Sequence, residues 1–321
     1  HYIDLQFDLS QVLFITTANW LDPIQAALRD RLEVLSLPSY TAVEKLQIAK
    51  RFLVPRQIEE HGLKRKQLKL PDATLRRLIL EYTHEAGVRQ LDREVASLAR
   101  KATRKLVAGE VTTTPLIISA KELPNYLGPP QFTSETAEKI TEVGIAMGLA
   151  WTPVGGEILF IEATRMPGSG KLMLTGSLGD VMKESAQTAL SYLRSHAKML
   201  GLELVNFDKH DLHIHVPAGA TPKDGPSAGA SLTVALASLL TKRLVRSDLA
   251  MTGEISLRGR ILRVGGIKEK VLAAARSGLK QVVLPAQNKS DWTEVPDEVR
   301  SKMKAHFVKQ ISELIALTLK R

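Results

Sequence analysis

The segment from Ala228 to Leu240, AGASLTVALASLL, constrains the fold of this chain more than any other feature. Its residues are small or apolar and none is charged, which predicts a helix that is buried on nearly all sides. Pro222, Gly225 and Pro226 come just before it and predict a stiff loop, so that Ser227 stands at the helix start. Free N–H groups and the positive end of the helix dipole favour an oxyanion at such a position.

A serine hydroxyl becomes an effective nucleophile only when a neighbouring group removes its proton. The downstream run Gly265-Gly266-Ile267-Lys268-Glu269-Lys270 opens a second helical segment, which extends to Ser277. A lysine there can act as the base if burial lowers its pKa enough to leave some neutral amine. Lys268 and Lys270 both flank the apolar stripe of this segment, so periodicity alone leaves both lysines open as candidates.

Two stretches carry a family resemblance, PKDGPSAG and AMTGEISLRGRILRVGGIKEKVLAAARSG. They resemble the proteolytic domain of the Lon family of ATP-dependent proteases, and the resemblance runs from about residue 136 to residue 285. It implies an endopeptidase with a Ser227–Lys270 dyad, because the dyad lysine of the family matches the second lysine of GGIKEK. It also implies that the hydroxyl of Thr252 accepts a hydrogen bond from that lysine and orients it.

Other interpretations of the serine motif were weighed. Outside its context, a Gly-Pro-Ser turn before a helix is usually a helix cap. Gly225 to Gly229 also fits the Gly-x-Ser-x-Gly elbow of α/β-hydrolases, but that elbow requires a strand running directly into it. Here a Pro- and Gly-containing loop precedes Ser227, and the only downstream histidine, His306, lies among lysines. We therefore expect no α/β-hydrolase triad.

Composition limits the remaining classes of protein. The chain has 321 residues, of which 44% are hydrophobic, no cysteine, and a formal net charge of +10. That length suffices for more than one core, and no apolar segment reaches the roughly 20 residues needed to cross a bilayer. Thiol catalysis and thiolate metal sites are excluded. The positive charge is spread along the chain, so no single domain stands out as basic.

Patterns along the chain predict several domains. Residues 12–18 read as one buried strand, and residues 41–64 and 71–107 show helical spacing, with Thr41 and Glu44 as a capping box and Pro55 as an interruption. Asn125 to Gln131 reads as a linker. We then expect strands at 143–152, 157–165, 171–176, 212–217 and 280–284, helices at 179–200, 227–241 and 300–319, and a hairpin at 249–264.

The N-terminal part resembles the end of an AAA+ ATPase module. Asn19 matches the sensor-1 position, Arg31 the arginine finger and Arg89 sensor 2, which implies that they contact nucleotide; without the motif, each arginine reads as a surface ion-pair residue. The resemblance thus predicts an α+β chain. Its parts are a C-terminal remnant of the AAA+ α/β subdomain (1–37), the small AAA+ helical bundle (38–122), a linker (123–135) and a mixed α/β Lon-type protease domain (136–321).

A complete nucleotide site is not expected. Gly170-Lys171 is followed by Leu172 rather than Ser or Thr, and Arg165 stands where a P-loop needs glycine. The only Asp-Glu pair, Asp297-Glu298, does not follow an apolar strand. The chain therefore reads as a truncated piece of a Lon protease that does not hydrolyse ATP by itself. Peptide hydrolysis is expected to need no cofactor, whereas the full-length family uses ATP and magnesium.

Further clusters have two interpretations each. His213 and His215 share one face of a strand, as a zinc pair would, but with no clear third ligand we expect no metal site. Asp224 either makes a local salt bridge or blocks the site in a resting state. Two clusters of basic residues either form solvated surfaces or bind the DNA backbone. They are Lys64, Arg65 and Lys66, and Arg100, Lys101, Arg104 and Lys105.

The family resemblance also implies a cytoplasmic homohexamer that acts in protein quality control. Its sites would face an interior chamber that admits unfolded proteins and peptides, and no membrane partner is expected. The alternative function is a DNA- or nucleotide-responsive binding module whose protease site is silent.

Overall fold

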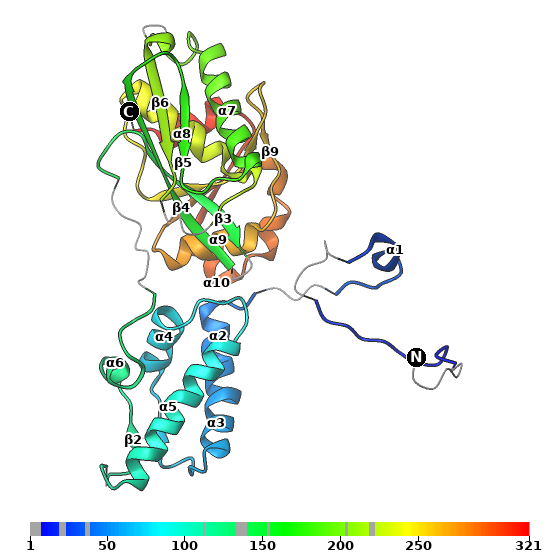
Figure 1. Cartoon of the computed structure of the whole chain (residues 1–321), viewed down its shortest axis with the longest axis vertical. Coiled ribbons are helices and arrows are strands. Elements are labelled where there is room, and N and C mark those ends of the chain that lie inside the picture. Colours follow the sequence, from blue (N-terminus) through cyan, green and yellow to red (C-terminus); the bar gives the residue numbers. More distant parts are fainter. Residues whose placement is uncertain are drawn as a thin grey trace. The chain divides into compact units, whose positions relative to one another are not determined.

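The computed structural model describes residues 8–18, 24–35, 39–111, 113–132, 140–152, 155–202, 205–217 and 222–320. The chain divides into two compact units, His1–Pro38 and Ser39–Arg321, which are described separately. The predicted combination of a helical bundle and a mixed α/β domain is confirmed within the second unit (Figure 1).

The described residues of the first unit contain one short helix, α1 (Ala26–Arg29), and residues 12–18 form no strand. The prediction of a buried strand there is wrong: Leu13 and Ile15 are each 84% exposed and Phe14 is 66% exposed. A β-strand needs a neighbouring strand to pair its N–H and C=O groups, and no described residue pairs with this segment.

The helical bundle begins with one long helical segment. It consists of α2 (Ala42–Ile48), a π-helical turn (Ala49–Leu53) and α3 (Val54–Glu60). The predicted capping box at its start is confirmed, since Glu44 N donates to Thr41 Oγ1 at 3.1 Å and Thr41 N donates to Glu44 Oε2 at 2.7 Å. The wider turn lies directly before Pro55, where the missing N–H interrupts the α-helical hydrogen-bond pattern.

Three more helices and a pair of short parallel strands complete the bundle. They are α4 (Asp72–Glu81), α5 (Arg89–Val107), α6 (Leu123–Leu127), β1 (Leu68–Lys69) and β2 (Leu116–Ile117). Leu123 and Tyr126 of α6 are buried in the bundle core. Residues 123–127 therefore belong to the bundle instead of the predicted linker, because α6 buries apolar side chains as a linker does not.

The sheet domain is built on a seven-stranded mixed sheet in the order β11-β10-β7-β3-β4-β6-β5. Its strands are β3 (Ile145–Thr152), β4 (Gly155–Pro167), β5 (Leu172–Thr175), β6 (His210–His215), β7 (Leu249–Met251), β10 (Gln281–Pro285) and β11 (Lys304–Val308). The β3–β4 and β4–β6 pairs are antiparallel and the others parallel. A separate hairpin joins β8 (Glu254–Ile255) to β9 (Ile261–Leu262).

Helices cover both faces of the sheet around β3 and β4 (Figure 1). A Cβ at Gly148 of β3 would meet Ser231 of α8 (Gly229–Thr241), whereas one at Gly156 of β4 would meet the backbone of α9 (Ile267–Arg276). The cross-strand register places these two glycines on opposite faces. The predicted all-round burial of α8 is confirmed, because α7 (Asp180–Ser195) and α11 (Ile311–Thr318) also pack against it.

The C-terminal segment differs from expectation. Instead of one helix over 300–319, it forms the short α10 (Asp297–Arg300), then strand β11 and then α11. Residues Lys304–Val308 pair in parallel with β10 along its whole length. The strand extends an existing sheet edge, so tertiary pairing decides its structure over local helical spacing.

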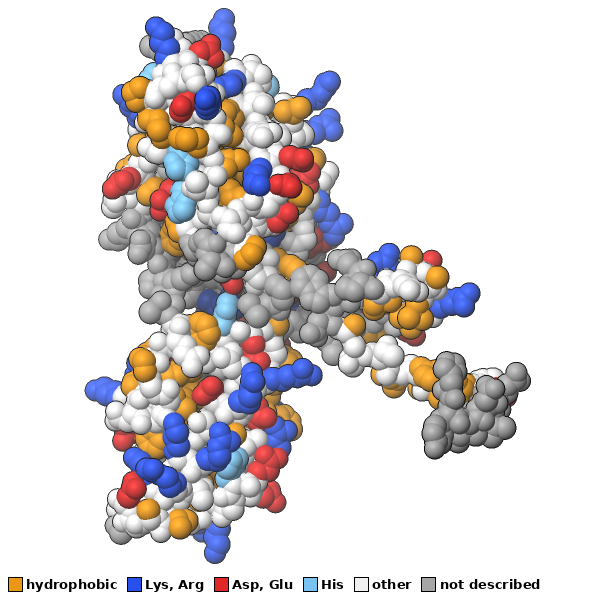
Figure 2. Space-filling view, in the orientation of Figure 1, with side chains coloured by type: hydrophobic (Ala, Val, Ile, Leu, Met, Phe, Trp, Pro, Cys, Tyr) orange, Lys and Arg blue, Asp and Glu red, His pale blue; other side chains and the backbone are white. Residues whose placement is uncertain are grey.

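The surface carries both signs of charge. Basic side chains are distributed over the bundle and the sheet domain and mixed with acidic ones (Figure 2), as the spread of charge along the sequence predicts. No described helix is both long enough and apolar enough to cross a membrane.

The bundle and the sheet domain have separate hydrophobic cores, and this leads to a stability prediction. Leu78 of α4 is fully buried in the bundle core, so Leu78→Ala should lower the free energy of unfolding of the bundle by about 2–5 kcal/mol. Leu80 on the same helix is 47% exposed, and Leu80→Ala is the matched control with a much smaller effect. Denaturant unfolding followed by hydrogen exchange measures both, and lost protection in α8 in the Leu78→Ala variant would contradict separate cores.

Candidate active site

Ser227 lies in a 3₁₀ turn, Pro226–Ala228, that leads directly into α8. Gly225 before it has a φ of 118°, a backbone conformation that favours glycine. Two backbone hydrogen bonds connect the turn to Gly253, which follows β7. Gly253 N donates to Ser227 O at 2.9 Å, and Ala230 N donates to Gly253 O at 2.9 Å. Ser227 is half-buried at the surface end of this otherwise buried helix.

Thr252 follows β7 and connects the serine turn to the second helix. It is 1% exposed, and its backbone N–H donates to Val283 O of β10 at 3.1 Å. Its hydroxyl donates to Ser227 O at 3.2 Å and accepts from Lys270 Nζ at 3.1 Å. The threonine therefore links the amine to the backbone of the serine.

Burial distinguishes the two lysines that helical spacing left open. Lys270, one turn into α9, is only 2% exposed, whereas Lys268 is half-buried. Burial lowers the pKa of the Lys270 amine from 10.5 to about 8, and the negative charge of the neighbouring Glu269 offsets a part of this shift. An amine with this pKa is partly neutral near physiological pH and can accept a proton.

The Ser227 backbone and the Lys270 amine are linked through the Thr252 hydroxyl. Among the interactions of the described residues, no hydrogen bond involves Ser227 Oγ, and the Lys270 amine donates to the Thr252 hydroxyl. The arrangement thus supplies a serine, a buried amine and a bridging hydroxyl, which are the groups that general-base activation of a serine needs.

Comparisons with known proteins identify the family of this chain. Residues 117–321 match the Lon protease (S16) C-terminal proteolytic domain, and residues 59–115 match the Lon protease AAA+ ATPase lid domain. The chain belongs to the Lon protease family. It is 54% identical to a Lon protease of Syntrophus aciditrophicus, with 100% of this chain and 40% of the relative aligned. Lon proteases of Desulfosudis oleivorans and Phenylobacterium zucineum are 53% and 55% identical over 99% and 98% of this chain, and over 39% and 40% of the relatives. The chain thus spans about 40% of the length of these curated relatives.

The position of α9 depends on close backbone packing that the motifs alone did not reveal. A Cβ at Gly156 would lie 2.1 Å from Glu269 O and 2.8 Å from Lys270 N, so only glycine allows the helix to pack so closely. At the start of α9, a Cβ at Gly266 would lie 2.8 Å from the ring of Trp151, the cross-strand neighbour of Gly156. The paired glycines at 155–156 and 265–266 were the available sequence signal for this contact.

Asp224 has a structural role in this arrangement. Its Oδ1 accepts hydrogen bonds from Met182 N at 3.0 Å and from Gly225 N at 2.8 Å. It therefore caps the N-terminus of α7, which has no capping side chain of its own, and ties the serine loop to that helix. No hydrogen bond or ion pair of the described residues joins Asp224 to Lys270.

The residues expected to contact nucleotide belong to different units of the chain. Asn19 lies outside the described residues. Arg31 is exposed in the turn after α1 of the first unit. Arg89 is the first residue of α5 and is exposed, while the Glu85 carboxylate accepts from Gln90 N and Leu91 N and so caps that helix.

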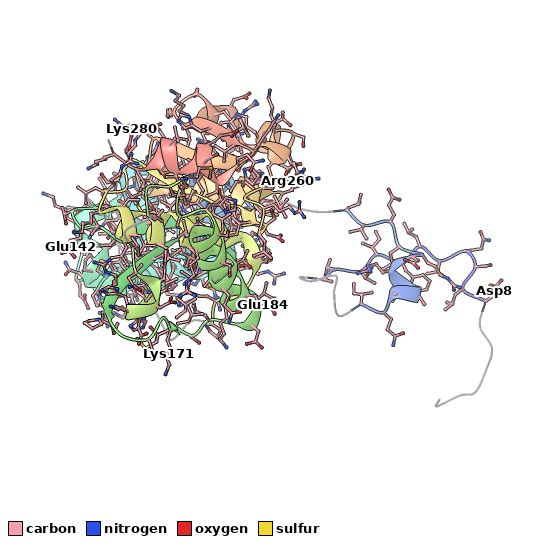
Figure 3. The ribbon with its side chains drawn as sticks, turned by 90° about the horizontal axis from the view of Figure 1, so that it is seen from above. Asp8, Glu142, Lys171, Glu184, Arg260 and Lys280 are labelled. Atoms are coloured by element: carbon pink, nitrogen blue, oxygen red, sulfur yellow. The ribbon has the colours of Figure 1, made fainter. Side chains whose placement is uncertain are left out.

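The Gly-Lys dipeptide lies in a turn between strands. Asp211 Oδ1 accepts from Ser169 N and Lys171 N at 2.8 Å each, and so occupies the N–H groups that a phosphate would need. Lys171 lies at the rim of the molecule (Figure 3). The structure thus explains why PGSGK is no P-loop.

The two histidines converge on a hydroxyl of the neighbouring strand. His213 Nε2 and His215 Nδ1 lie 2.9 Å and 2.7 Å from Thr175 Oγ1. The described part of the chain contains no group of three or more metal-ligating side chains. Both imidazoles therefore lie within hydrogen-bonding distance of the same hydroxyl group.

The basic residues of α5 partly interact within the bundle. Lys101 Nζ donates to Tyr126 O, Lys105 Nζ lies 4.6 Å from the centre of the Tyr126 ring, and Arg104 pairs with Glu110 at 3.6 Å. Lys64, Arg65 and Lys66 are exposed. Lys101 and Lys105 thus contribute to the attachment of α6 to the bundle.

The buried amine leads to a pH prediction. In the folded state Lys270 loses its proton near pH 8, whereas in the unfolded chain it stays protonated up to about pH 10.5. Between these two pH values the unfolded state binds more protons at Lys270 than the folded state does. The contribution of Lys270 to the free energy of unfolding therefore rises with pH across this window, and it is most unfavourable below pH 8.

Lys270→Met should therefore raise the free energy of unfolding at pH 7 by on the order of 3 kcal/mol, and the gain should shrink toward pH 10. Lys268→Met is the matched control and should change little. Lys45 in the bundle also has a pKa lowered to about 8 by burial, so only the difference from wild type isolates Lys270. Urea unfolding at pH 7 and pH 10 provides the measurement, and a destabilised Lys270→Met variant at pH 7 would contradict the cost of burial.

Proposed function

We propose that this chain is a serine endopeptidase with a Ser227–Lys270 dyad. One observation carries the proposal: the buried Lys270 amine donates to the Thr252 hydroxyl, which in turn donates to the carbonyl of Ser227. A lysine with its pKa lowered to about 8 is matched to general-base work near neutral pH. Membership in the Lon protease family supports the same chemistry.

In the proposed reaction, Ser227 Oγ attacks the scissile carbonyl carbon as its proton moves to Lys270 Nζ. The tetrahedral oxyanion is stabilised by backbone N–H groups at the start of the serine turn. When the C–N bond breaks, Lys270 returns the proton to the leaving amine. Water then attacks the acyl-enzyme, Lys270 acts again as the base, and the serine is released.

Thr252 has a positioning role in this proposal. Its hydroxyl accepts one hydrogen bond from the amine, which restricts where the nitrogen lone pair can point once the amine is neutral. Because the same hydroxyl also donates to Ser227 O, the position of the amine is fixed relative to the backbone of Ser227. The side chain of Ser227 can then rotate toward the amine.

The proposal also covers the substrates and the assembly of this chain, and it takes both from the Lon protease family. We propose unfolded proteins and peptides as substrates and a homohexamer as the working assembly. ATP and magnesium belong to the full-length family, whereas peptide hydrolysis by the dyad uses neither. Asn19, Arg31 and Arg89 are proposed to contact nucleotide only in a complete ATPase module.

Substitution of the dyad tests the mechanism. Ser227→Ala and Lys270→Met should each reduce hydrolysis of a fluorogenic peptide by at least about 10³-fold, because nucleophile and base act as one unit. Lys268→Met should keep most of the activity. A serine-reactive phosphonate probe, followed by peptide mass spectrometry, should label Ser227 in the wild type only.

The outcomes separate the candidate functions. An inactive Lys268→Met variant beside an active Lys270→Met variant would reassign the base. A wild-type chain that neither cleaves peptide nor takes up the probe would favour the alternative of a nucleotide- or DNA-responsive module with a silent site.

Nucleotide independence gives a second prediction. Short peptides and an unfolded casein should be cut without ATP, because the dyad needs no nucleotide for its chemistry. A folded substrate of typical stability, about 5–15 kcal/mol, should resist even with ATP, because this sequence has neither a P-loop nor Walker B carboxylates to drive unfolding. Phosphate release is measured in parallel, and ATP-driven loss of the folded substrate would refute the prediction.

A further inference from the structure

We infer that Asn288 is a positioning residue for the proposed dyad: its side chain determines where α9 begins and thereby holds the Lys270 amine on the Thr252 hydroxyl. This inference rests on the proposed function. Asn288 ends the short 3₁₀ turn Ala286–Asn288 that directly follows β10, and it does not touch the reacting groups.

The side chain of Asn288 pairs with the backbone of the segment that enters α9. Its Oδ1 accepts from Val264 N at 3.1 Å and its Nδ2 donates to Val264 O at 2.8 Å. The neighbouring Gln287 Oε1 accepts from Arg263 N at 3.0 Å. β9 ends before these residues. The two amide side chains hydrogen-bond to the backbone that follows β9, as a neighbouring strand would.

The orientation and burial of this amide leave it little freedom. Asn288 is fully buried, and its Nδ2 also donates to Asp291 Oδ2, while Asp291 pairs with Arg263 at 2.7 Å. Both partners of Nδ2 are acceptors and the partner of Oδ1 is a donor, so only one orientation of the amide satisfies all of them. A buried, fully bonded amide of this kind specifies one position for its partner.

The contact lies a short distance along the chain from the base. Gly265 and Gly266 follow Val264, and Lys270 N donates to Gly266 O at 3.0 Å in the first turn of α9. Gly266 is itself constrained, because its φ is 68° and a Cβ there would lie 2.8 Å from the Trp151 ring, so the fixed position of Val264 is passed on to the start of the helix.

The same strand also fixes the other end of the amine's hydrogen bond. Val283 O of β10 accepts from Thr252 N at 3.1 Å, and β10 continues into the turn that ends at Asn288. β10 and its turn therefore locate both the orienting hydroxyl and the start of the helix that carries the amine. This shared frame explains how a 3.1 Å contact is kept between two segments that are not adjacent in sequence.

The test compares Asn288→Leu and Asn288→Asp with Thr318→Val in the full chain. Asn288→Leu removes all three hydrogen bonds, and Asn288→Asp keeps the size but places a carboxylate against Val264 O and Asp291. Thr318 is also fully buried and loses one hydrogen bond, to Leu314 O in α11, which controls for destabilisation alone. Peptide kcat and KM are measured from pH 6 to pH 10, at a temperature where circular dichroism shows each variant folded.

We expect kcat of both Asn288 variants to fall on the order of 10²-fold, with KM nearly unchanged, because a displaced base loses orientation more than substrate affinity. The midpoint of the pH–rate profile should move upward from about 8, since a displaced amine is less desolvated. Thr318→Val should keep the wild-type profile. Asn288 variants with the kcat and pH midpoint of Thr318→Val would overturn the inference.

Hydrogen exchange over residues 263–270 tests the positioning role without measuring activity. It therefore distinguishes a failure of this inference from a failure of the proposed function, also in an inactive variant. Faster exchange there in the Asn288 variants, but not in Thr318→Val, supports the positioning role, whereas unchanged exchange overturns it. A wild-type chain that cleaves no peptide refutes the proposed function, and the exchange data still decide whether Asn288 fixes the start of α9. If Asn288→Leu does not fold, Asn288→Asp provides the same comparison.

Discussion

The Lys270 amine is buried in the sheet domain, and removing its charged form from water costs free energy. The candidate site depends on how the surrounding elements hold this group. Removing a charged amine from water disfavours its charged form, and this lowers its pKa to about 8. Its one hydrogen-bond partner among the described residues is the Thr252 hydroxyl, which is itself buried. A buried polar group with so few partners requires a rigid surrounding, and α9 meets this requirement through close packing at Gly156.

The site results from the convergence of two helices that lie on opposite faces of one sheet. α8 carries the serine turn at its start, and α9 carries the lysine in its first turn. Both are connected through Thr252, at the end of β7 in the middle of the sheet. The central strands are therefore covered on both faces, and the polar groups of the site lie where the two helices begin.

Local patterns predicted a large part of the fold. The apolar run of α8, the capping box at Thr41 and most strands of the sheet appear at or near the expected positions, because their periodicity and burial agree. Two of the failures have one cause. Residues 12–18 have strand-like composition but pair with no described residue, and residues 304–308 lie in a segment with helical spacing but pair with β10. In both cases pairing with distant residues decides the structure.

The sequence by itself determined which chemical groups are present: a serine before a buried helix, a Gly-Gly-Ile-Lys-Glu-Lys run and a threonine between them, in a chain without cysteine. It did not decide between Lys268 and Lys270 by periodicity, because both flank the apolar stripe. The tertiary structure decided which lysine is buried, since Lys270 is 2% exposed whereas Lys268 is half-buried. It also decided the use of Asp224 as a helix cap and of Asn288 as a partner of Val264. Such roles depend on contacts between residues distant in sequence, which folding creates and local patterns do not contain.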